Sequence, residues 1–206
     1  MNRSGKFITF EGVEGVGKTT QLQRLSALLT ERGFPVVLTR EPGGTRFGQQ
    51  LRHIILDPST RFYSKYTEMM LFMADRLEHI ETVIIPALQM GKIVLCDRFL
   101  DSTVAYQVGG RQLPSEFVDQ LHQLIAIQPD LTILLDVEPE EGIRRAQGRA
   151  KLDRFEQETM AFHHRVRNKY LEIHAANLGR VHRVSTSNTS IDDVFSRIVD
   201  IVMNNL

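Results

Sequence analysis

Residues 7–19 read FITFEGVEGVGKT, and this stretch decides the fold class. It opens with a short run of mostly apolar side chains, which is typical of a buried strand. From Thr19 onward leucines recur at helical spacing, at Leu22, Leu25 and Leu29. Strand, glycine-rich loop and helix follow one another directly, which is the setting of a phosphate-binding loop.

The loop itself, residues 12–19, matches the pattern G-x-x-x-x-G-K-[ST]. Its glycines let the backbone wrap closely around phosphate, so that N–H groups point at the oxygens. We expect Lys18 to reach the β- and γ-phosphates and the Thr19 hydroxyl to bind Mg²⁺. The helix that follows directs its positive end at the same anion. The predicted triphosphate-binding residues are Gly12, Val13, Glu14, Gly15, Val16, Gly17, Lys18, Thr19 and Thr20.

The rest of the chain alternates between strand-like and helix-like segments. Further strands are predicted at 35–39, 93–97, 131–136 and 181–184, and helices at 49–56, 67–91, 115–127, after Pro139, at 156–176 and from 190 onward. Such alternation implies parallel strands with helices on both faces, and ligands beyond the carboxyl ends of the strands. We therefore predict a single α/β kinase domain over residues 1–206, with a five-stranded parallel sheet.

Composition limits the partners and the compartment. Lys plus Arg and Asp plus Glu number 25 each among the 206 residues. A protein that coats long nucleic acid is usually more basic, so no polynucleotide partner is expected. Cys96 is the only cysteine, which rules out an internal disulfide and suits a reducing compartment. The N-terminal residues have no features of a signal peptide or membrane span, so a cytoplasmic location is expected.

Two classes of phosphate-loop protein compete. A guanine-nucleotide switch would need an Asn-Lys-x-Asp element, and the nearest string, residues 168–171, reads NKYL and lacks the aspartate. A kinase of small phosphate acceptors needs cations around two anionic substrates, because transfer is mainly positioning and charge neutralisation. Candidate arginines are Arg52, Arg76, Arg98, Arg145, Arg149 and Arg154. A kinase is favoured, and a regulator that hydrolyses nucleotide without transfer remains the alternative.

Several blocks, in order along the chain, resemble thymidylate kinases. They are FEGVEG at 10–15, TREPGGT at 39–45, CDRF at 96–99, DST at 101–103, AYQ at 105–107, PDLT at 129–132 and LDRFE at 152–156. The resemblance covers nearly the whole chain. It implies a P-loop nucleoside monophosphate kinase fold, transfer of the γ-phosphoryl group of MgATP to dTMP, and a homodimer. A kinase of uridylate or cytidylate remains the alternative.

The resemblance also implies roles for residues around the acceptor. Glu14 would accept a hydrogen bond from the sugar of the monophosphate, and Arg52 would hold its phosphate. Phe72 would stack on thymine while Arg76, four residues later on the same helix face, bonds the carbonyl edge of the base. The remaining predicted acceptor-site residues are Glu41, Arg98, Thr103 and Gln107.

Two segments are predicted to supply the groups that act on the transferred phosphoryl group, residues 97–98 and a lid. Asp97 ends a predicted strand and would hold Mg²⁺ through water, while Arg98 would clamp the acceptor and transferred phosphates. Some thymidylate kinases carry a catalytic arginine at the position of Gly15. Its absence here implies that a lid, at about residues 142–155, supplies the arginine. Arg149 is the first candidate, with Arg145 and Arg154 behind it.

The seven histidines, among them His163 and His164, show no ligand constellation and are interpreted as surface or packing residues.

Overall fold

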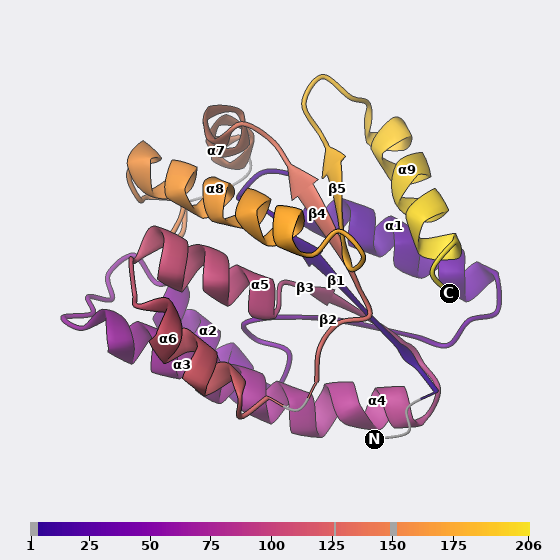
Figure 1. Cartoon of the computed structure of the whole chain (residues 1–206), viewed down its shortest axis with the longest axis horizontal. Helices are drawn as coiled ribbons and strands as arrows, with labels where there is room; N and C mark the ends of the chain where they lie inside the picture. Colours follow the sequence, from indigo (N-terminus) through magenta and orange to yellow (C-terminus); the bar gives the residue numbers. More distant parts are fainter. Residues whose placement is uncertain (1–3, 126, 149–151) are drawn as a thin grey trace.

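The computed structural model describes residues 4–125, 127–148 and 152–206 and contains one five-stranded sheet. All strand pairs are parallel, and the order is β2-β3-β1-β4-β5 (Figure 1). The strands are β1 Lys6–Glu11, β2 Val36–Arg40, β3 Ile93–Asp97, β4 Leu131–Asp136 and β5 Val181–Ser185. The predicted five-stranded parallel α/β fold is confirmed.

Helices cover both faces of this sheet (Figure 1). They are α1 Lys18–Glu31, α2 Arg46–Leu56, α3 Lys65–His79, α4 Ile85–Gln89, α5 Leu100–Thr103, α6 Ser115–His122, α7 Pro139–Gln147, α8 Met160–Ala176 and α9 Ile191–Met203, with π-helical segments η1 Ile80–Ile84 and η2 Val104–Gly110. Within the described ranges, no helix is both long and apolar enough to cross a membrane.

Successive side chains of β1 point to opposite faces of the sheet and belong to two different hydrophobic clusters. Ile8 and Phe10 belong to the larger cluster, which includes Leu25 of α1 and Ile198 of α9. Phe7 points to the opposite face and packs with residues of η1 and α4. Both faces of β1 are therefore buried, as expected for a central parallel strand, and its carboxyl end is held rigidly where the phosphate loop begins.

Several helix boundaries differ from the predictions, and the helix predicted at 49–56 begins three residues earlier, at Arg46. The helix predicted at 115–127 ends at His122. The helix predicted to start near residue 156 starts at Met160, because the Thr159 side chain accepts the Phe162 N–H and caps it. The predicted helix 67–91 begins two residues earlier, at Lys65, and is interrupted by η1 just before Pro86, a residue that lacks a backbone N–H.

Candidate active site

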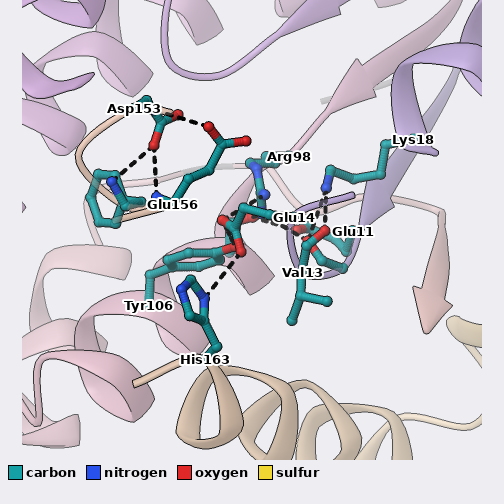
Figure 2. Close-up of polar contacts among 12 residues, drawn as sticks. Glu11, Val13, Glu14, Lys18, Arg98, Tyr106, Asp153, Glu156 and His163 are labelled. Carbon is teal, nitrogen blue, oxygen red and sulfur yellow. Dashed lines mark hydrogen bonds and ion pairs between the residues drawn. The ribbon is translucent and has the colours of Figure 1, made fainter. Parts of the chain in front are cut away.

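The phosphate loop curls around the side chain of its own lysine. Gly15 and Gly17 adopt positive φ angles of 70° and 92°, a conformation that glycine allows. Lys18 is buried at the start of α1, and its Nζ donates to the carbonyl oxygens of Gly12 at 3.0 Å and Val13 at 2.9 Å (Figure 2). Burial, helped by nearby Arg98, lowers the pKa of Lys18 to about 8. A cation is thus held inside the loop.

Two oxygen ligands meet beside the loop. The Thr19 hydroxyl donates to Oδ2 of Asp97 at 3.0 Å. Asp97 ends β3, and its pairing with Phe10 of β1 brings it level with the start of the loop. Among the described residues, no group of three or more His, Cys, Asp or Glu side chains could form a metal cage. A hydroxyl and one carboxylate are nevertheless the kind of partial set that Mg²⁺ completes with phosphate and water.

Arg98 occupies a constrained position next to Asp97. Its φ of 72° lies in the left-handed region, which is costly for a residue with a side chain and is found preferentially at functional sites. Its backbone N–H donates to the carbonyl oxygen of Phe10 at 2.9 Å, and Nη1 donates to the carbonyl oxygen of Gly12 at 3.0 Å. The side chain is therefore aimed at the phosphate loop from the neighbouring strand.

The charge of Arg98 is strongly stabilised. Burial opposes it, but Tyr106, Tyr170 and Glu14 outweigh burial and hold the pKa of Arg98 well above its usual range. The guanidinium carbon lies 4.8 Å from the centre of the Tyr106 ring. Arg98 remains a cation throughout the physiological range.

Glu14 lies within the loop and faces Tyr106 and Arg98. Its Oε1 accepts a hydrogen bond from the Tyr106 hydroxyl and lies 3.4 Å from Nη2 of Arg98 (Figure 2). Burial would raise the pKa of Glu14, but His163, Arg98, Lys18 and Tyr106 together lower it to about 2. Glu14 is therefore an anion placed among cations.

Arg76 is enclosed by protein partners and is 2% exposed. Nε donates to Oε2 of Glu41 at 2.6 Å, Nη1 to the Thr103 hydroxyl at 2.6 Å, and Nη2 to the carbonyl oxygen of Phe99 at 2.9 Å. Glu41 also binds His79. Glu41 and Thr103, both predicted as substrate-binding residues, are thus partners that orient Arg76.

One cleft of about 530 Å³ joins the loop to α3 and η2. The predicted site residues that line it are Glu14, Gly15, Lys18, Thr19, Glu41, Arg52, Phe72, Arg76, Asp97, Arg98, Thr103 and Gln107. Of the other loop residues, Val13 and Val16 are buried in the core and Thr20 is exposed. Residues from five separate segments of the sequence therefore meet at one cavity.

The far end of the cleft is aromatic. The ring of Phe72 lies 6.0 Å from that of Phe155, which also packs edge-on against Tyr106. Gln107 donates to Oε1 of Glu68 at 3.2 Å. Such an aromatic wall beside amide and guanidinium groups suits a nucleobase.

The structure describes two of the three predicted lid arginines, Arg145 and Arg154. Arg149 lies outside the described residues. Arg145 donates to Oε1 of Glu141 at 2.5 Å and to the carbonyl oxygen of Thr186 at 3.0 Å, which ties α7 to the segment after β5.

Arg154 is anchored elsewhere. It donates to the carbonyl oxygen of Ile55 at 2.8 Å and to Oε2 of Glu68 at 2.6 Å. These contacts hold its guanidinium against α2 and α3, where it supports the neighbouring Phe155.

Close packing explains why Gly15 carries no side chain. A Cβ on Gly15 would overlap the carbonyl oxygen of Gly142 in α7 and lie 2.7 Å from its carbonyl carbon. A Cβ on Gly142 would in turn lie 2.5 Å from the carbonyl oxygen of Glu14. The loop and α7 therefore touch through two glycines, and there is no space between them for an arginine.

Sequence reasoning missed four residues of the site. Tyr106 and Phe155 belong to the blocks AYQ and LDRFE, so their position in those blocks was a usable signal. Ser102 donates to Glu11 at 2.5 Å beneath Arg98, and His163 lies against Glu14. Nothing local in the sequence distinguishes His163 from a packing histidine.

Comparisons with known proteins agree on one family. The model of the family described as thymidylate kinase matches residues 10–198. A thymidylate kinase of Desulforapulum autotrophicum is 45% identical over 202 residues, covering 94% of this chain and 88% of the relative. One from Nostoc punctiforme is 43% identical and covers 98% and 99%. The crystal structure of thymidylate kinase from Ehrlichia chaffeensis superposes with a TM-score of 0.79 at 34% identity, covering 97% of this chain and 98% of that one.

Proposed function

This chain belongs to the thymidylate kinase family, and from that premise we propose that it transfers the γ-phosphoryl group of ATP to dTMP, yielding ADP and dTDP. The observation that carries the proposal is a cleft with two unlike ends. At one end Lys18, Thr19 and Asp97 suit a triphosphate. At the other, Phe72 and Arg76 suit a base.

The reaction needs no covalent intermediate. An oxygen of the dTMP phosphate attacks the γ-phosphorus in line, the bond to the bridging oxygen breaks, and that oxygen leaves with ADP. Lys18 neutralises the β- and γ-oxygens. Arg98, aimed at the loop from β3, neutralises the transferred group, and Arg52 holds the acceptor phosphate. Catalysis then consists of positioning and charge stabilisation by groups that are fixed beforehand.

We propose Thr19 and Asp97 as the residues that hold Mg²⁺. Both supply hard oxygen ligands, and they lie within hydrogen-bond distance of each other at the mouth of the loop. Thr19 and Asp97 would hold the ion, whose charge would offset the negative charge that develops on the phosphates.

A panel of acceptors tests the function. The protein is incubated with ATP, Mg²⁺ and each of dTMP, dUMP, UMP, CMP, AMP and GMP, and both nucleoside diphosphate and free phosphate are measured. Conversion of dTMP to dTDP with one ADP formed per dTDP is expected. Preference for UMP or CMP would refute the substrate, and phosphate release without an acceptor product would point to the hydrolysing regulator.

Arg149 is proposed as the catalytic arginine of a lid at about residues 142–155. Arg145 and Arg154 are both held by protein partners, and the resemblance to bacterial thymidylate kinases assigns a catalytic arginine to the lid. Arg149→Ala should lower kcat at least about tenfold, equivalent to about 1.4 kcal/mol of transition-state stabilisation. Arg144→Ala, an exposed position on α7, is the matched control. A smaller loss in steady-state kinetics would remove Arg149 from the mechanism.

We also propose that the protein is a homodimer. The outward side of α2 presents Phe47 at 45% and Ile54 at 47% exposure, and α3 beside it presents Met70 at 49% and Tyr66 at 42%. Exposed apolar side chains on two packed helices are typical of a surface that is buried in an assembly. A second copy using the same face would cover both stripes symmetrically.

Met70→Lys should convert the dimer to a monomer in sedimentation at micromolar concentration, because it places a charge on each side of a symmetric interface. Met90→Lys is the control, since Met90 is 69% exposed at the end of α4, away from these helices. A wild-type protein that sediments as a monomer would contradict the proposal.

A cytoplasmic location is proposed as well. Cys96 is a buried free thiol, which suits a reducing compartment.

A further inference from the structure

His163 lies where α8 passes the phosphate loop. It is 1% exposed and packs edge-on against Phe162. Its Nδ1 lies 3.5 Å from Oε2 of Glu14, and Figure 2 shows the imidazole facing this carboxylate from below. The adjacent His164 points away, pairs with Glu140 at 2.8 Å and has a side chain that is 45% exposed. Of the two neighbours, only His163 faces the site.

The two carboxylate oxygens of Glu14 have different surroundings. Oε1 accepts from Tyr106 and lies near Arg98. Among the described residues, Oε2 has no hydrogen-bond partner, and neither does Nδ1 or Nε2 of His163. Buried polar atoms without partners are costly, so each requires an explanation. Here two such atoms face each other at a distance that a small side-chain movement would close.

The chemistry of the pair determines where the hydrogen lies. The low pKa of Glu14 makes it a carboxylate, which can only accept hydrogen bonds. Nδ1 of His163 must therefore carry a hydrogen for the contact to be attractive. The other charged neighbours of Glu14, Arg98 and Lys18, lie on the side of the carboxylate away from His163 (Figure 2) and would draw it away from the imidazole.

We propose that His163 is a positioning residue that holds Glu14 through Oε2, so that the carboxylate, fixed on its other side by Tyr106, keeps one orientation in which it can accept from the sugar hydroxyl of the acceptor. The inference rests on the proposed function. The only free sugar hydroxyl of a 2′-deoxynucleoside 5′-phosphate is at the 3′ carbon, so this hydroxyl is the group that His163 helps to select. His163 acts on acceptor affinity and has no contact with the reacting phosphates.

The experiment compares two acceptors, dTMP and its 3′-deoxy analogue, in variants of the full-length enzyme. His163→Leu removes the N–H and should raise KM and Kd for dTMP about tenfold with kcat changed less than about threefold, the pattern of lost uniform binding. For the 3′-deoxy analogue, which cannot donate to Glu14, the same variant should change KM less than about twofold.

Two amide substitutions separate positioning from packing. His163→Asn places an N–H near the position of Nδ1 and should restore dTMP affinity to within about threefold of wild type. His163→Gln places its N–H near Nε2 instead and should show the same loss of dTMP affinity as His163→Leu. Comparison of the asparagine and glutamine variants therefore tests the role of Nδ1 even if the leucine variant does not fold. His164→Leu is the control and should leave both acceptors unaffected.

Equal loss for both acceptors, or equal behaviour of the His163→Asn and His163→Gln variants, would overturn the role of His163. Wild-type protein that does not phosphorylate dTMP would instead overturn the proposed function, so the two failures are distinct.

Discussion

Lys18→Ala should abolish phosphoryl transfer while leaving the fold intact. The Nζ of Lys18 is fixed within the loop by two carbonyl oxygens, so it meets incoming phosphates with little reorganisation. Its loss should lower kcat/KM at least about 10³-fold, about 4 kcal/mol of transition-state stabilisation. The free energy of unfolding should change by only about 1 kcal/mol, because the variant loses two hydrogen bonds but also a buried charge.

Coupled-assay kinetics and urea unfolding measure the two effects separately. Lys169→Ala is the control, since Lys169 pairs with Glu172 along α8 and has no contact with the loop. A Lys18→Ala enzyme with more than about a tenth of wild-type kcat/KM would contradict the assignment of the phosphate loop.

Gly15→Ala should damage both stability and activity. Alanine must adopt a φ of 70°, and its Cβ would overlap the carbonyl oxygen of Gly142. The left-handed conformation costs about 1–2 kcal/mol and overpacking about 1–3 kcal/mol, so the free energy of unfolding should fall by about 2–5 kcal/mol. Relief of the overlap displaces the loop from the triphosphate, which should lower kcat/KM for ATP about 100-fold.

Gly33→Ala separates the two causes. Gly33 has a φ of 84°, but no heavy atom lies within 4 Å of the added Cβ, so only the cost of the left-handed conformation should appear. Gly15→Arg should be no more active than Gly15→Ala, although it adds a cation, because α7 occupies the space. An active Gly15→Arg enzyme would show that α7 moves freely away from the loop.

The sequence predicted the phosphate loop because all its determinants are local. The glycines, Lys18 and Thr19 are close together in the chain, the apolar run before the loop identifies the strand, and the helical spacing of the leucines after it identifies the helix. The five strands were predicted for the same reason. Helix ends were predicted less well, since the start of α8 depends on one side chain, Thr159, and the segment 100–110 is too short and irregular for periodicity to reveal.

The sequence alone therefore determined the α/β class, the triphosphate loop and, through resemblance, the family. Tertiary structure decided which side chains that are distant in the sequence contact one another in the site. The strand order β2-β3-β1-β4-β5 places Asp97 beside Thr19. Glu41, predicted to bind substrate, instead accepts a hydrogen bond from Arg76 and orients it. Close approach of α7 excludes a side chain at Gly15, and the path of α8 brings His163 to Glu14. Such contacts arise from the packing of elements far apart in the chain, and no short-range pattern encodes them.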